Sequence, residues 1–315
     1  MEHYVSNFNL GFLPQGLALY RSMQRHLQAF QFWVVCMDHA CFDALQALNL
    51  PNMHLIDFSS VESDAYKRLR GERTVAEYCW TINPLNPHLV FSLDPAIDRV
   101  TYLDADLWFL SAPDLIFREF SDSGKSVLVT EHAYLPRYDQ SSSSGVFCAQ
   151  WITFVRNRSE SLRKWWEEQC FQWCFNRAED GKFGDQKYME SWPTLFPGTV
   201  HSLSTPEVIL APWNVQDINL ENGVAYHFHG LRILDNSRYA VKSFYSISGE
   251  CERKIYKPYL RDLSDSIKDM KNIGLEIKSQ VGTSKLQHSE SMQSFLFKQL
   301  MNNGGFSLKQ FDFLA

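Results

Sequence analysis

The sequence predicts an α/β fold built on a Rossmann-like, mostly parallel central sheet with flanking helices. Short apolar segments rich in β-branched and aromatic residues alternate with segments of helical periodicity along the first part of the chain. This alternation is typical of parallel strands joined by crossover helices. The chain has 315 residues, of which 45% are hydrophobic and 14% aromatic, so it can bury a large core.

The expected elements follow this alternation in order. Strands and helices are expected in turn at residues 3–6, 16–30, 32–38, 41–48 and 53–58. Residues 61–92 are expected to be mostly helical or irregular, and the next strand covers residues 100–110, VTYLDADLWFL. Smaller elements follow at residues 126–132 and 144–154.

Charge and cysteine content exclude several classes of protein. The net charge is −6 with interspersed signs, which gives no general basic surface for nucleic acid. Seven cysteines without a C-x-x-C pair indicate neither a disulfide framework nor a zinc ribbon. The first residues lack a basic, then apolar leader, and no segment has the ~18 apolar residues of a membrane span. We therefore expect a cytoplasmic protein.

Two acidic residues end the strand at residues 100–110. In an extended segment, Asp104 and Asp106 would point to the same side, about 6.6 Å apart. Two carboxylates so placed repel unless a cation or a proton lies between them. Taken alone, the pair is more simply explained as the start of an ordinary loop, because aspartate is common at strand ends. Ligands of open α/β sheets bind beyond the carboxyl ends of strands, which is where this pair falls.

Two further clusters contain polar side chains. Asp185 and Gln186 lie in FGDQKYM and could be either functional residues or the start of a helix. His227 and His229 precede Gly230 in YHFHG, and such histidines are more often packed than metal-bound. Imidazole and carboxylates together nevertheless suit Mn²⁺, with phosphate oxygens as the missing ligands. Neither a G-x-G-x-x-G motif nor a P-loop is present.

The order of these clusters resembles a known family. The segments LPQGLALYRS, RTVAEYCWT, TYLDADL, GDQKY, APWNV and YHFHG are similar to those of GT-A nucleotide-sugar glycosyltransferases, particularly glycosyltransferase family 8 and its bacterial relatives. The resemblance covers about residues 1–260. It implies a catalytic domain at 1–265, with a nucleotide-binding half at 1–110 and an acceptor-side half at 111–265. A helical tail would follow at residues 266–315, with helices at 266–280 and 291–305.

The resemblance also implies roles for individual residues. Asp104, Asp106 and His227 would bind Mn²⁺ or Mg²⁺ that bridges the donor diphosphate, so Asp104 also belongs to the donor site. Asp185 and Gln186 would lie against the donor sugar, and the anomeric configuration would be retained.

Three residues in the first quarter of the chain match positions near the nucleotide in similar enzymes. Asn7, Phe8 and Arg73 are candidate contacts to uridine or the diphosphate, although Phe8 could equally be core. The tryptophans at positions 165, 166, 173 and 192 could stack on an acceptor sugar, but their helical spacing favours packing in the core.

Two segments depart from the family pattern. Where members usually have Asn before a small residue and Gly, this chain has Ser143, Ser144 and Gly145. The lysine that usually follows H-x-x-G is replaced by Ile233. Arg232 could take its place, since guanidinium binds phosphate well.

The function that this pattern predicts is a metal-dependent transfer of sugar from a nucleotide-diphosphate sugar, with UDP-sugar favoured, to a saccharide or lipid-linked acceptor. Two alternatives stay open: a sugar-phosphate nucleotidyltransferase, and a catalytically silent glycan-binding protein of the same fold. The apolar stripes of the tail would suit docking on the catalytic domain, a second copy of the chain, or the inner face of a membrane.

Overall fold

A seven-stranded sheet forms the centre of the protein. The computed structural model describes residues 1–235, 238–242, 244–280 and 306–310. The strand order is β3-β2-β1-β4-β7-β6-β8. The strands are β1 (Glu2–Phe8), β2 (Phe30–Cys36), β3 (Met53–Asp57), β4 (Arg99–Leu103), β6 (Val127–Glu131), β7 (Phe147–Val155) and β8 (Val200–Ser202). Strand β7 runs antiparallel to β4 and β6, and the other neighbours are parallel. The predicted fold class is confirmed.

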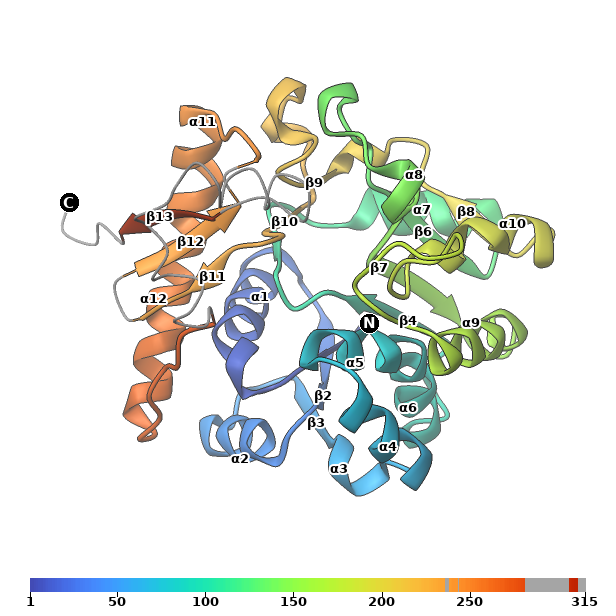
Figure 1. Cartoon of the computed structure of the whole chain (residues 1–315), viewed down its shortest axis with the longest axis horizontal. Coiled ribbons are helices and arrows are strands. Elements are labelled where there is room, and N and C mark those ends of the chain that lie inside the picture. The colour runs from blue at the N-terminus through green and yellow to red at the C-terminus, as the bar shows by residue number, and fades with distance from the viewer. Residues whose placement is uncertain (236–237, 243, 281–305, 311–315) are drawn as a thin grey trace.

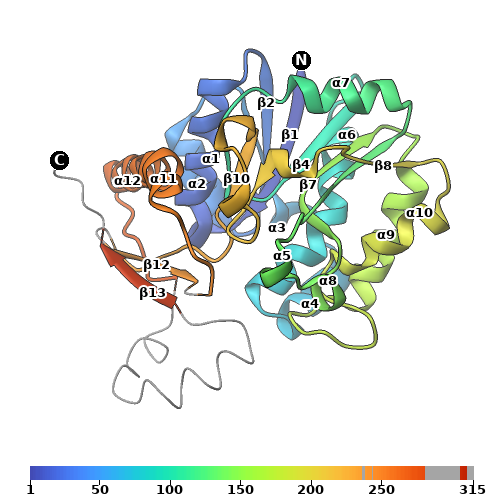
Figure 2. The same ribbon diagram turned by 90° about the horizontal axis from the view of Figure 1, so that it is seen from above.

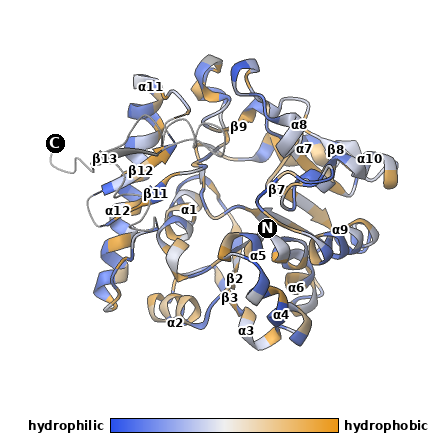
Figure 3. Ribbon diagram, in the orientation of Figure 1, coloured by the Kyte–Doolittle hydropathy of each residue, from blue (hydrophilic) through white to orange (hydrophobic). Residues whose placement is uncertain are grey.

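Helices surround this sheet, some directly against it and others, such as α12 (Lys257–Asn272), beyond a first layer of helices (Figure 1). They are α1 (Leu13–His26), α2 (His39–Leu48), α3 (Phe58–Val61), α4 (Asp64–Glu72), α5 (Val75–Ile82), α6 (Asn86–Leu93), α7 (Asp114–Ser123), α8 (Ser141–Ser144), α9 (Glu160–Gln172), α10 (Trp192–Leu195), α11 (Gly249–Cys251) and α12 (Lys257–Asn272). Hydrophilic and hydrophobic residues both occur along α9 and α12, as expected for helices with one buried face (Figure 3). Local sequence sets several helix starts, such as the capping box of Thr74 and Glu77 at α5.

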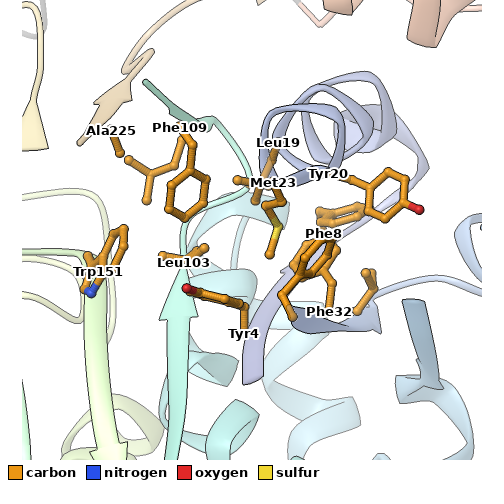
Figure 4. Packing of buried hydrophobic residues seen from close by; sticks show 14 of the residues in the cluster. Tyr4, Phe8, Leu19, Tyr20, Met23, Phe32, Leu103, Phe109, Trp151 and Ala225 are labelled. Carbon is orange, nitrogen blue, oxygen red and sulfur yellow. The ribbon is translucent and has the colours of Figure 1, made fainter. Parts of the chain in front are cut away.

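Aromatic side chains fill the space between α1 and the sheet. Phe8, the last residue of β1, is 2% exposed and lies beneath α1 near Phe32 (Figure 4). A Cβ atom on Gly16 of α1 would lie 2.4 Å from Phe8 Cζ. The helix can approach the strand this closely because Gly16 has no side chain.

The predicted strand at residues 100–110 is divided in two. Strand β4 ends at Leu103, and β5 (Leu107–Phe109) belongs to a second sheet of order β5-β10-β9. Its other strands are β9 (Ile209–Leu210) and β10 (Ala225–His227), and β10 pairs antiparallel with β5. Asp104 and Asp106 therefore lie in a turn, closed by a 3.1 Å hydrogen bond from Leu107 N to Asp104 O. The extended geometry predicted for this pair is wrong, because pairing with β10 draws β5 out of the central sheet.

Helix α12 packs on α1. Figures 1 and 2 both show α12 alongside α1. Arg21 and Arg25 of α1 form ion pairs with Asp269 and Asp262 of α12. Trp108 Nε1 donates to Asp262 Oδ2 over 2.7 Å. The domain boundary predicted at residue 265 falls inside α12.

The tail is helical over only part of its predicted length. The helix expected at residues 266–280 ends at Asn272, and the helix expected at 291–305 lies outside the described residues. A third sheet has the order β11-β12-β13, with strands β11 (Arg232–Ile233), β12 (Arg238–Lys242) and β13 (Phe306–Gln310). Among the described residues, no helix has both the length and the apolar character needed to cross a membrane.

Candidate functional site

Two carboxylates and an imidazole meet where β4, β5 and β10 come together. Asp104 and Asp106 lie in the turn after β4, and His227 is the last residue of β10. His227 Nε2 lies 3.1 Å from Asp106 Oδ1 and 3.6 Å from Asp104 Oδ2. One potential ligand atom from each of the three lies within 4.8 Å of the others. This spacing and mixed oxygen and nitrogen donor set could hold a divalent metal ion. We call these residues the metal triad.

The charges of the triad are mutually dependent. Burial lowers the pKa of His227, but the Asp106 carboxylate outweighs burial and holds it well above its usual value. Burial raises the pKa of Asp104, whereas His227 overcomes the effect of burial on Asp106 and lowers its pKa. An imidazolium between the carboxylates thus supplies the positive charge that their repulsion requires. A metal ion would supply the same charge, with the imidazole deprotonated.

Residues that the sequence analysis did not select orient the triad. His227 Nδ1 donates to the side-chain oxygen of Gln150 on β7 over 2.6 Å, which leaves Nε2 directed at the carboxylates. The Tyr102 hydroxyl donates to Asp104 Oδ1 over 2.7 Å. Gln150 is 1% exposed and is a polar residue within the apolar strand FCAQWITFV. That isolated amide was the one local signal that could have identified it, since buried polar groups are normally hydrogen-bonded.

Replacing Gln150 by leucine should weaken Mn²⁺ binding by about 10- to 100-fold, the usual effect of losing a group that orients a metal-bound histidine. The change removes the acceptor for His227 Nδ1 but keeps an apolar side chain in the strand. Calorimetric titration of Mn²⁺ measures the effect. Thr153→Val is the matched control, because Thr153 lies on the same strand and bonds Thr101. Equal affinities in both variants would show that Gln150 does not orient the ligand.

Asp185 and Gln186 precede a short helix, η4 (Lys187–Ser191), but Asp185 does not cap it. The Asp185 carboxylate is 4% exposed and accepts a 2.7 Å hydrogen bond from Asn83 Nδ2. Burial raises the pKa of Asp185 to about 7, and the nearby Asp104 carboxylate adds to the shift. Gln186 Nε2 donates to Ser144 O over 2.8 Å. The structure thus brings Asp185 into the electrostatic environment of the triad.

Two cationic side chains lie near the Asp106 and His229 side chains. Arg232 on β11 interacts electrostatically with Asp106, and its guanidinium lies over the ring of Phe12. Lys242 Nζ on β12 lies 2.7 Å from His229 Nε2. Burial lowers the pKa of Lys242 to about 8, with a contribution from Arg232. Within the described part of the chain, neither cation forms an ion pair within 4 Å of a carboxylate.

Lys242 was not selected from the sequence because it lies 13 residues from His229. A Cβ atom on Gly230, whose φ is +80°, would lie 2.7 Å from Lys242 Cγ. Gly230 therefore lets the lysine stem pass close to the backbone, next to the site.

The structure does not support two of the predicted nucleotide contacts. Phe8 is enclosed in the core, as described above. Arg73 is 7% exposed and donates to Cys170 O and Phe171 O, near the end of α9, and to Thr81 Oγ1. Its guanidinium is therefore used to hold the end of α9, and we do not retain it as a phosphate contact.

Asn7 remains a candidate, although much of its hydrogen-bonding capacity is used internally. It is 6% exposed, donates to Cys79 O and accepts from Asn86 Nδ2, each over 3.0 Å. The tryptophans at positions 166 and 192 are fully buried, and those at 165 and 173 pack against the same core, as the helical spacing favoured.

Comparison with known proteins identifies proteins of similar sequence. No protein-family model matches the sequence. The uncharacterized protein YfnF of Bacillus subtilis strain 168 is 31% identical over 251 residues, which are 73% of this chain and 82% of YfnF. The chain belongs to the YfnF family. The uncharacterized protein YfnD of the same organism is 25% identical over 272 residues, covering 81% of this chain and 86% of YfnD.

A solved structure shows the same fold as this member of the YfnF family. The apo structure of WbbM, described as a bifunctional glycosyltransferase, matches with a TM-score of 0.51 and 13% identity. The match covers 86% of this chain and 50% of the WbbM chain. The fold is GT-A, as the motifs predicted. In this fold the triad lies beyond the carboxyl end of β4, where ligands of open α/β sheets bind.

Proposed function

We propose that the protein transfers a glycosyl group from a nucleotide-diphosphate sugar, favouring a UDP-sugar, to a saccharide or lipid-linked acceptor. The observation that carries this proposal is the metal triad, with two cations and the buried Asp185 in its neighbourhood. WbbM, which shares the fold, is described as a glycosyltransferase. Asp104, Asp106 and His227 would hold Mn²⁺ or Mg²⁺, since their donor atoms are suitably spaced.

Each part of the site would have a separate task. Breaking the bond from the anomeric carbon to the diphosphate builds negative charge on the leaving phosphate, and a bound divalent ion would stabilise that charge. Arg232 and Lys242 would contact the same phosphates, with Lys242 supplying the ammonium group that the segment after Gly230 lacks. Asp185 and Gln186 would face the sugar, where positive charge develops as in glycoside hydrolysis. The proposed outcome is retention of configuration.

UDP should stabilise the protein far more with Mn²⁺ than with chelator, because the ion would join the triad to the phosphates. Thermal unfolding and calorimetry with UDP, with and without Mn²⁺, measure this coupling. Asp106→Asn should reduce the coupling and leave the fold intact, since it relieves the repulsion within the triad. The exposed Asp64 of α4 provides the matched control, Asp64→Asn.

Three outcomes separate the candidate functions. Equal affinity for UDP with and without metal would overturn the metal-bridged donor site. Metal-dependent UDP binding without sugar transfer or donor hydrolysis would favour a silent glycan-binding protein. Formation of a nucleotide sugar from a sugar phosphate and UTP would favour the nucleotidyltransferase.

A further inference from the structure

A cavity of about 540 Å³ opens where β6 and β8 end. Its lining includes Glu131 at the end of β6, Tyr134 and Leu135 just after that strand, and Glu207 after β8. Strands β6 and β8 are parallel to each other and antiparallel to β7, which is antiparallel to β4. The carboxyl ends of β4, β6 and β8 therefore lie at one edge of the sheet. Strands β4 and β6 are separated by two strand spacings, roughly 10 Å, so the cavity and the triad are close neighbours.

The backbone that lines the cavity has an uncommon conformation at one residue. Ala133 has φ of +50°, in the left-handed region that alanine rarely occupies. The conformation allows the rings of His132 and Tyr134 to stack, with centroids 4.5 Å apart. Backbone strain of this kind persists only where the surrounding structure enforces it, often at binding sites. Here Trp213 Nε1 and Asn214 Nδ2 both donate to His132 O, over 2.7 and 3.1 Å.

Tyr134 connects the cavity to the proposed catalytic residues. Its hydroxyl group interacts with the side chain of Ser144. The carbonyl oxygen of Ser144 accepts the hydrogen bond from Gln186 Nε2. The Trp213 ring lies 5.5 Å from the ring of His227. The Trp213 ring also lies 5.7 Å from the ring of Tyr134, so a ligand that contacts Tyr134 would be one aromatic side chain away from the triad.

The lining favours a neutral ligand with many hydroxyl groups. Glu131 and Glu207 offer carboxylate oxygens to a ligand. One oxygen of Glu131 already accepts a hydrogen bond from Ser202 Oγ. Carboxylates accept hydrogen bonds from hydroxyl groups but repel anions. The residues that line the cavity include no lysine, arginine or histidine. Tyr134, Leu135 and Ile218 supply apolar surface for the face of a ring.

We propose that this cavity is the acceptor site and that it takes a neutral pyranose unit of a saccharide. The assignment rests on the proposed glycosyl transfer. In that step an acceptor hydroxyl oxygen bonds the anomeric carbon of the donor. The bond from this carbon to the diphosphate oxygen breaks, its electron pair stays with the diphosphate, and the hydroxyl proton passes to the departing diphosphate. Glucuronic acid or a phosphorylated sugar would be excluded by Glu131 and Glu207.

Saturation-transfer NMR on the whole chain tests the cavity without requiring activity. The probes are methyl β-glucopyranoside, methyl β-galactopyranoside and methyl β-glucuronide, which is the negatively charged counterpart of the first. The neutral glycosides should receive saturation and the glucuronide should not. Glu207→Lys should weaken binding of the neutral probes by roughly 10-fold, about the value of one hydrogen bond to a charged group, and admit the glucuronide. Glu72→Lys, an exposed change on α4, should behave like the parent.

Tyr134→Ala provides a second variant, because it removes the ring but no charge. It should weaken binding of the neutral glycosides and still not allow the glucuronide to bind. Preferential binding of the glucuronide by the parent, or no binding of any neutral probe, would overturn the assignment.

Donor hydrolysis by water, measured on the same protein, separates the two proposals. Hydrolysis without binding of neutral glycosides overturns the acceptor site alone. Binding of neutral glycosides without hydrolysis supports the cavity as a saccharide site and counts against the transferase.

Discussion

Replacing Asp185 by asparagine or Gln186 by alanine should lower the turnover number at least ~10²-fold, while metal-dependent UDP binding stays nearly unchanged. Both side chains are proposed to face the sugar, where positive charge develops, whereas the triad holds the diphosphate before and during the reaction. An interaction made mainly in the transition state lowers the turnover number when it is removed, and hardly changes binding of the ground state. Donor hydrolysis serves as the assay, with calorimetry of UDP and Mn²⁺ beside it.

The local contacts make these variants suitable. Asparagine at position 185 can still accept the hydrogen bond from Asn83, so the buried pair is preserved. Asp180→Asn and Gln172→Ala are matched controls, because both residues are exposed and lie near Asp185 and Gln186 in the sequence. Parental rates in both site variants would mean that Asp185 and Gln186 only shape the turn before η4.

The second large effect concerns the choice between two neighbouring histidines. His227→Ala should weaken Mn²⁺ binding by at least ~10²-fold, more than the loss of a residue that only orients a ligand. The change removes one donor atom of the triad, so the two carboxylates alone would have to hold the ion. His229→Ala should have a smaller effect, because the ring of His229 contacts Lys242 and lies outside the triad. A metal titration followed by calorimetry gives both affinities.

His229→Ala is itself the matched control, since both histidines belong to the same segment, with His227 buried and His229 partly buried. Thermal unfolding without metal should show that each variant is folded. A larger loss of Mn²⁺ affinity in His229→Ala than in His227→Ala would assign the metal to the other imidazole.

Local patterns in the sequence were sufficient for much of the fold. Alternating strands and helices predicted the parallel part of the sheet, because apolar periodicity follows from which faces of each element are buried. The acidic pair at Asp104 and Asp106 was recognised because like charges two residues apart need a counter-charge. His227 was selected because the H-x-x-G motif resembles that of a known family, and the structure places it against both carboxylates.

Long-range packing set the remaining features, since they depend on partners that are distant along the chain. Strand β5 turns away from the central sheet to pair with β10, more than a hundred residues later, so no local pattern could show that Asp104 and Asp106 occupy a turn. Gln150 and His227 are in contact although they lie 77 residues apart in the sequence. Lys242 contacts His229 from β12, which belongs to a different sheet from β10, the strand that ends at His227.

Packing between distant segments explains why the structure does not support two of the predicted nucleotide contacts. It also explains why the sequence did not predict the cavity. Arg73 could have faced a phosphate, yet its donors meet the end of α9, 97 and 98 residues away. Whether such a side chain faces ligand or protein depends on which elements pack against it. The sequence of this protein therefore specified the kinds of side chain at the site and their order along the chain. The tertiary structure set their orientation and the space beside them, because both arise where segments far apart in the sequence pack together.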